Sequence, residues 1–163
     1  MQPKASKSST TYQECLIDWQ ENKFCPAPEA ELRPIKPTKT AMVPMRDGVN
    51  LYTELFFPQE AQCFPIILCR SPYPYSRPSR NDEMDIDRYL DAGYGVVYQL
   101  TRGQYKSEGV FRWLKDEASD GHDCINWLSE QPWCNGNVGM LGVSYLGSTQ
   151  LLAAKTKPKA LKC

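Results

Sequence analysis

Histidine is almost missing from this chain: among its 163 residues, His122 is the only one. Zinc sites draw on histidine or on closely spaced cysteine pairs, and none of the seven cysteines forms a C-x-x-C pair. We therefore expect no metal site. The odd number of cysteines and their irregular spacing are most economically explained by reduced, mostly buried thiols in a cytoplasmic protein.

The chain also has no excess of positive or negative charge. Lysine and arginine number 19, aspartate and glutamate number 19, and the formal net charge is zero, so nothing predicts a nucleic-acid partner. No stretch is apolar for long enough to cross a membrane, and residues 1–11 contain no apolar signal core. Because no phosphate-binding loop is present either, we expect no cofactor and no membrane partner.

What the chain does have is a regular alternation of apolar runs, typical of buried strands, with amphipathic stretches typical of helices. In chain order we predict a hairpin over 42–57, a strand over 65–69, a helix over 81–93, a strand over 95–100, a helix over 116–130, a strand over 138–143 and a helix over 146–155. This order predicts an α/β fold, with a hairpin followed by a mainly parallel sheet and helices on both faces.

The two ends of the chain differ from this pattern. Residues 1–40 are polar and contain several prolines, and we expect them to be a leader before a domain over 41–163. After Pro158, residues 160–163 look like the start of another strand. An α/β sheet that stops there would be incomplete, so we expect a domain truncated after the helix over 146–155.

Residues 138–147 read Val-Gly-Met-Leu-Gly-Val-Ser-Tyr-Leu-Gly and combine a short apolar strand, a turn and the opening of a helix. Ser144 lies at the turn. A serine there is held at the tip of a sheet with its hydroxyl exposed, as in the nucleophile elbow of α/β-hydrolases. Leu146 replaces the second glycine of the usual G-x-S-x-G pattern. Gly-x-Ser turns are common and mostly structural, but the strand before this one and the helix after it favour a nucleophile.

Six blocks of sequence resemble those of the cocaine esterase and Xaa-Pro dipeptidyl-peptidase-like (CocE/NonD) serine hydrolases. They occur in the same order, at residues 46–51, 70–73, 102–109, 117–123, 131–136 and 139–147. Their order and spacing are far more specific than any single block. In this family Tyr-Leu-Gly commonly follows the serine, so the missing second glycine strengthens the likeness. The resemblance implies that the chain is the N-terminal part of an α/β-hydrolase domain.

The resemblance also implies three site residues. Ser144 is expected to be the nucleophile that attacks an ester or amide carbonyl and becomes acylated. The backbone N–H of Tyr145, at a helix N-terminus, is expected to be one oxyanion donor. The hydroxyl of Tyr73, in the loop after the third strand, is expected to be the second. Residue type alone would instead favour a loop aromatic that packs on its neighbouring prolines.

Other charged residues in the matched blocks are interpreted as structural. Leu100 stands where the family usually has an acidic residue, which leaves the partner of Arg102 open. We interpret Arg102 and Glu108 as residues that hold their loop. Asp120 and Asp123 are expected to be solvated or near-cap charges on the helix over 116–130.

The proton-transfer half of a catalytic triad is missing where α/β-hydrolases carry it. In those enzymes the acid and the histidine follow the serine, but residues 145–163 contain no Asp, Glu or His. His122 precedes the serine on a predicted helix, where a partly exposed structural histidine is the ordinary interpretation. We therefore expect a truncated or split hydrolase, with a downstream polypeptide that carries the Asp and the His.

Three functions stay open. The elbow and the six blocks favour a serine hydrolase of small-molecule ester, amide or peptide substrates, including dipeptides that end in proline. The missing acid and base favour a catalytically inactive remnant or a binding module on the same fold. An acyltransferase would pass the same acyl group to an acceptor other than water, but nothing in the sequence favours it.

Overall fold

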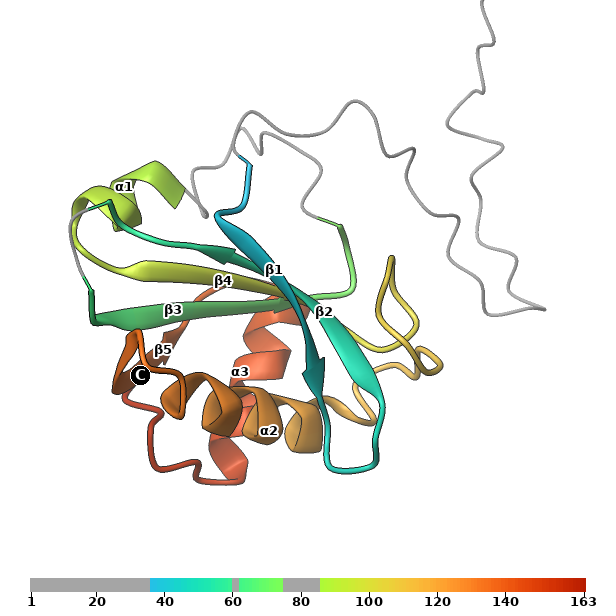
Figure 1. The fold of residues 1–163 in the computed structure, drawn as a ribbon. Coiled ribbons are helices and arrows are strands. Elements are labelled where there is room, and N and C mark those ends of the chain that lie inside the picture. The colour runs from blue at the N-terminus through green and yellow to red at the C-terminus, as the bar shows by residue number, and fades with distance from the viewer. Residues whose placement is uncertain (1–35, 60–61, 75–85) are drawn as a thin grey trace, which may run out of the picture.

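The computed structural model describes residues 36–59, 62–74 and 86–163, which form one sheet with helices on both faces (Figure 1). The strands are β1 (Lys39–Pro44), β2 (Asn50–Phe56), β3 (Phe64–Ser71), β4 (Gly95–Leu100) and β5 (Cys134–Met140), and the helices are α1 (Ile86–Asp91), α2 (Glu117–Ser129) and α3 (Tyr145–Lys155). None of the helices in the described ranges is long and apolar enough to cross a membrane.

The strand order is β1-β2-β4-β3-β5. The hairpin strands β1 and β2 pair antiparallel, and β2 pairs antiparallel with β4. Beyond that point the pairing is parallel, between β4 and β3 and between β3 and β5. The predicted α/β arrangement, a hairpin followed by a parallel portion, is therefore confirmed.

The two faces of the sheet bury separate apolar clusters. Helices α2 and α3 cover one face and α1 lies on the other, as Figure 1 shows. The first cluster joins the sheet to α2 and α3 and includes Leu68, Val97, Ile125, Leu128 and Ala153. The second lies toward α1 and includes Phe56, Cys69, Ile86, Tyr98 and Leu100. All six residues of β4 are buried, as expected for a central strand of this kind.

A glycine allows α2 and α3 to pack closely. A Cβ atom at Gly121 would lie 2.7 Å from the Cβ of Ala153, nearer than two side-chain carbons can approach. Small residues on both helices therefore bring the first half of α2 against the last half of α3. This contact fixes the direction in which α3 leaves the sheet.

The strand predicted over 138–143 is wrong in its bounds, because β5 begins at Cys134 and ends at Met140. Cys134 pairs with Phe64, and the register of the two strands shifts before Ile66. Gly136 takes a φ of +83° in this stretch, which a glycine adopts without strain. Pairing with β3 thus extends the strand toward the N-terminus, across residues whose local pattern indicates a turn.

Two predictions lie partly outside the described residues. The leader over residues 1–40 is described only from residue 36 onward, and β1 already begins at Lys39, so the sheet starts before the predicted boundary. The helix predicted over 81–93 is described from Ile86 to Asp91. Its first residues are outside the described part.

Residues 160–163 continue the sheet beside β5, as the sequence indicates. Leu161 forms a parallel bridge with Val138. The N–H of Val138 donates to the carbonyl of Ala160 at 2.9 Å, and the N–H of Lys162 donates to the carbonyl of Val138 at 2.8 Å. This segment therefore runs in the same direction as β5.

Candidate active site

Ser144 lies on the turn between β5 and α3 and is exposed. Its backbone has a φ of 60° and a ψ of −123°. A residue with a side chain rarely takes this conformation, which costs about 1–3 kcal/mol and persists only where the surroundings enforce it. The serine is therefore held in a strained and exposed position, as the nucleophile elbow requires.

Residues on both sides of Ser144 enforce this turn. Gly142 has a φ of +138°, and a Cβ atom there would lie 2.3 Å from the Cβ of Leu146. The side-chain amide of Gln150 donates to the carbonyl of Gly142 at 2.7 Å. The N–H of Leu146 donates to the carbonyl of Val143 at 3.1 Å. The turn is so tight that only glycine fits at position 142.

Tyr145 is the first residue of α3, so its backbone N–H has no acceptor within the helix. The side chain of Ser144 does not cap the helix either. A helix N-terminus carries a partial positive charge and attracts anions. The N–H of Tyr145 therefore fits the predicted role of an oxyanion donor next to the serine hydroxyl.

The side chain of Tyr145 points into the protein, where it ends in a buried charged network. Its hydroxyl donates to Oε1 of Glu117 at 2.9 Å, and Nη1 of Arg70 lies 2.6 Å from Oε2 of the same carboxylate. Nε of Arg70 donates to Oε1 of Gln99 at 2.8 Å. Burial raises the pKa of Tyr145, and the charge of Glu117 raises it further, so the hydroxyl stays protonated and donates.

Arg102 ties the loop after β4 to two other elements. Its guanidinium donates to both carboxylate oxygens of Asp120 at 2.7 and 2.8 Å, and to both of Asp47 at 2.7 and 3.0 Å. The hydrogen bonds to Asp120 and then to Asp47 raise the pKa of Arg102. Its partners are thus in the hairpin turn and on α2, whatever residue stands at position 100. The interpretation as a loop-holding residue is confirmed.

Asp120 lies in the first turn of α2, in line with the near-cap half of the expectation, but the expectation that Asp120 and Asp123 are solvated is wrong. Asp120 is 1% exposed, because it faces inward from α2 and meets Arg102. The side chain of Asp123 is 14% exposed and accepts hydrogen bonds from the backbone N–H and the guanidinium of Arg46. Both partners are more than fifteen residues away along the chain, which is why the local pattern does not reveal them.

Glu108 holds the same loop on its other side. One carboxylate oxygen accepts hydrogen bonds from the backbone N–H and from the side-chain amide of Asn50, both at 2.9 Å. These two hydrogen bonds lower the pKa of Glu108. The loop is therefore fastened to the start of β2, as expected.

Tyr73 lies two residues after β3, and the residue is 47% exposed. Its N–H donates to Oγ of Ser71 at 3.0 Å, and its carbonyl accepts a hydrogen bond from the hydroxyl of Tyr98 at 3.0 Å. Because β3 and β5 are adjacent and parallel, the residues that follow them emerge at the same edge of the sheet. Ser144, Tyr145 and Tyr73 are thus brought to one edge.

His122 is held at the other end of α3. Its Nδ1 lies 2.9 Å from Oγ1 of Thr156, the residue that follows α3, whereas Ser144 precedes it. With a rise of about 1.5 Å per residue, these two ends are about 18 Å apart along the helix axis. His122 is therefore not placed to accept a proton from Ser144, and the structural interpretation fits its contacts.

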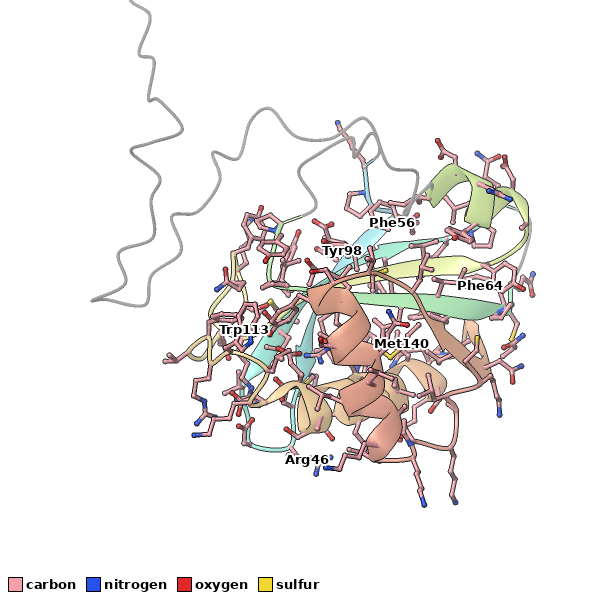
Figure 2. The ribbon with its side chains drawn as sticks, turned by 180° about the vertical axis from the view of Figure 1, so that it is seen from behind. Arg46, Phe56, Phe64, Tyr98, Trp113 and Met140 are labelled. Atoms are coloured by element: carbon pink, nitrogen blue, oxygen red, sulfur yellow. The ribbon has the colours of Figure 1, made fainter. Side chains whose placement is uncertain are left out.

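Several residues near the elbow are not found by sequence reasoning. Arg70 is fully buried although it is charged, and Glu117 is 3% exposed. The available signal was that Arg70 directly follows the apolar run over 65–69, where a charge needs a buried partner. Trp113 is 65% exposed, and its ring centroid lies 4.9 Å from that of Tyr145. Figure 2 shows it beside the upper end of α3.

The cysteines behave largely as expected. In the described ranges Cys69, Cys124 and Cys134 are buried, and Cys63 and Cys163 are exposed, all as free thiols. Burial raises the pKa of Cys69 to about 12, so the thiol stays protonated and lies 2.9 Å from the carbonyl of Leu141. The same ranges hold no group of three His, Cys, Asp or Glu side chains placed to bind a metal ion.

Comparison with known proteins relates this geometry to a family. Residues 47–163 match the model of the X-Pro dipeptidyl-peptidase family, S15. The chain belongs to this family. A cocaine esterase from Rhodococcus sp. (strain MB1 Bresler) is 44% identical over 74% of this chain and 21% of its own length. A Xaa-Pro dipeptidyl-peptidase from Lactobacillus helveticus is 30% identical over 60% of this chain and 15% of its own length.

A solved structure agrees with these relatives. The CocE/NonD family hydrolase from Staphylococcus aureus superposes with a TM-score of 0.68 and 35% identity, over 76% of this chain and 26% of its own. The predicted α/β-hydrolase fold and the resemblance to CocE/NonD hydrolases are therefore confirmed. The chain spans about a fifth of the length of the curated relatives it matches.

Proposed function

We propose that this chain carries the nucleophile and the oxyanion hole of a serine hydrolase that cleaves ester or amide bonds through an acyl-enzyme. The observation that carries the proposal is the backbone of Ser144, strained and exposed at the N-terminus of α3. Membership of a family that includes esterases and dipeptidyl-peptidases supports it.

The proposed reaction begins with attack of the Ser144 hydroxyl oxygen on the substrate carbonyl carbon. A new C–O bond forms, the hydroxyl proton passes to a base, and the carbonyl electron pair moves onto oxygen. The N–H of Tyr145 and the hydroxyl of Tyr73 donate to that oxyanion. When the oxyanion collapses, the bond to the alcohol or amine breaks and the leaving group takes up the proton. Water then releases the acyl group in the same way.

The base and its orienting acid are proposed to come from a polypeptide that continues the sheet beyond residue 163. The parallel bridge between Leu161 and Val138 supports this, because the segment runs alongside β5. The carboxyl end of such a strand points toward the edge at which Ser144 lies.

The proposed substrates are small-molecule esters or amides, or peptides of the Xaa-Pro type.

The free thiols of the described cysteines support the proposed cytoplasmic location. The position of His122, at the far end of α3, favours one alternative: an inactive binding module that keeps the elbow without a base.

A fluorophosphonate probe, which forms a covalent bond with an activated serine, tests the proposal. The purified chain is treated alone and together with the part of the Rhodococcus cocaine esterase that follows the matched region. We expect labelling of Ser144 in the combined sample, and none in Ser144→Ala. Ser148→Ala, which changes another serine on α3, is the matched control and should be labelled like the wild type.

Loss of the second donor gives a further measure. Tyr73→Phe should slow labelling by about a hundred- to a thousandfold, as is typical for one oxyanion donor. Absence of Ser144 labelling in both samples would contradict the enzyme and support the binding module. Equal labelling of the wild type and Tyr73→Phe would remove Tyr73 from the proposed hole.

A further inference from the structure

The turn that carries Tyr73 is held by side chains from two neighbouring strands. Ser71, the last residue of β3, accepts a hydrogen bond from the N–H of Tyr73 at 3.0 Å. The hydroxyl of Tyr98, on β4, donates to the carbonyl of Tyr73 at 3.0 Å. Both backbone polar groups of Tyr73 are therefore bonded, while its side chain remains substantially exposed.

Tyr98 is itself rigidly placed. It is 5% exposed and belongs to the cluster of buried side chains on the α1 side of the sheet. Leu141 and Leu146, which lie on either side of the elbow turn, pack against that cluster. Figure 2 shows Tyr98 next to the upper end of α3, where the elbow lies. A single packed cluster thus underlies both the turn of Tyr73 and the turn of Ser144.

This arrangement separates two tasks. The backbone carbonyl of Tyr73 is held by the hydroxyl of Tyr98 at 3.0 Å and by that of Ser71 at 3.1 Å, whereas Tyr73 itself is 47% exposed. The hydroxyl of Tyr98 is not needed to fill space in this cluster, because phenylalanine has nearly the same volume as tyrosine. What the hydroxyl adds is a hydrogen bond to one particular carbonyl.

We propose that Tyr98 is a positioning residue for catalysis: by bonding the carbonyl of Tyr73, it holds the Tyr73 hydroxyl where the oxyanion forms. The inference rests on the proposed function, because it assumes that Ser144 is acylated and that Tyr73 is a donor. A displacement of about 1 Å in such a group costs up to about a hundredfold in rate. Loss of the Tyr98 hydroxyl should therefore slow acylation by about ten- to a hundredfold.

The test compares Tyr98→Phe with the wild type, using two phosphonate probes. Each chain is combined with the downstream part of the Rhodococcus cocaine esterase, as in the labelling experiment above. One probe carries P=O and the other carries P=S at the same place. Sulfur accepts hydrogen bonds more weakly than oxygen, so an intact oxyanion hole favours the P=O probe. The maximal labelling rate and the half-saturating probe concentration are measured separately for each probe.

We expect Tyr98→Phe to lower the maximal rate with the P=O probe, to leave its half-saturating concentration unchanged, and to reduce the preference for P=O by about tenfold. A merely structural effect would slow both probes equally. Tyr52→Phe is the matched control, because it removes a tyrosine hydrogen bond of 3.2 Å to Glu54 on β2. Its probe preference should equal that of the wild type.

A second variant keeps the test valid if Tyr98→Phe unfolds. Ser71→Ala removes the other support of the same turn and should reduce the P=O preference in the same direction. An unchanged preference in every folded variant overturns the positioning role and leaves the proposed function standing. Absence of Ser144 labelling in the wild type overturns the proposed function, and the positioning role with it.

Discussion

The hydroxyl of Tyr145 lies 2.9 Å from Oε1 of Glu117, so the residue that follows Ser144 is anchored to the first turn of α2. The other oxygen of Glu117 is 2.6 Å from Nη1 of Arg70, whose side chain is fully buried on β3. The beginnings of α2 and α3 and the end of β3 are thus joined behind the elbow by one carboxylate.

Removal of that carboxylate should strongly destabilise the fold. In Glu117→Ala the buried charge of Arg70 loses its main partner, and the expected loss is about 3–5 kcal/mol in the free energy of unfolding. Urea denaturation of the wild type and the variant measures it. Glu130→Ala, at an exposed residue that follows α2, is the control and should change stability by less than about 0.5 kcal/mol. Similar losses in the two variants would contradict the role of the network.

Substitution of Gly142 should disrupt the elbow. In Gly142→Ala the new Cβ atom would lie 2.3 Å from the Cβ of Leu146, and a φ of +138° would be strained for alanine. We expect a lower melting temperature and loss of probe labelling at Ser144. Gly136→Ala is a matched control, since Gly136 also has a positive φ but its Cβ would meet no atom within 4 Å. If Gly136→Ala impaired labelling as much as Gly142→Ala did, the steric argument would fail.

Acid should weaken the ion pair between Asp47, in the hairpin turn, and Arg102, which also binds Asp120 on α2. The hydrogen bond from Arg102 lowers the pKa of Asp47 below its ordinary 3.8. A carboxyl group with a lowered pKa in the folded state contributes stability above its unfolded pKa, and this contribution is lost as the pH falls through the folded pKa. Stability should therefore fall as the pH drops below about 4.

Asp47→Asn isolates that contribution. Its melting temperature should fall less steeply with acid than that of the wild type, because Asp47, one of the two carboxylate partners of Arg102, no longer titrates. Thermal unfolding followed by circular dichroism from neutral pH into the acid range measures the two slopes. Asp91→Asn, at an exposed residue at the end of α1, should keep the wild-type slope. Parallel curves for Asp47→Asn and the wild type would show that the ion pair does not contribute.

His122 should be dispensable for the reaction of Ser144. In His122→Ala the hydrogen bond to Thr156 is lost, so stability should fall by about 0.5–1.5 kcal/mol. The rate of fluorophosphonate labelling at Ser144 should stay the same, because the imidazole is at the opposite end of α3. A large decrease in that rate, with the fold intact, would make His122 a catalytic base after all.

Local patterns in the sequence identify most of the elements. β4 and α3 are found almost to the residue, because an apolar run and a helix-forming stretch are local signals. The elbow at Ser144 is equally local, since the strand, the turn and the helix lie within ten residues. These features could be predicted because nothing distant in the chain decides them.

Interactions across the chain could not be predicted in the same way. The pairing of Cys134 with Phe64 extends β5 through residues that look like a turn. Asp120 looks like a surface charge until Arg102 and Arg70 are placed beside it. The hydrogen bond from Tyr98 to Tyr73 connects residues 25 positions apart. Each of these depends on which strands become neighbours, and no local period contains that information.

The strained backbone of Ser144 lowers the stability of the fold at the same residue that carries the proposed nucleophile. Glycine would adopt the same angles without strain, so Ser144→Gly should yield a more stable protein that lacks the proposed nucleophilic oxygen. A substitution chosen for heat resistance alone would therefore remove the side chain on which the proposed reaction depends.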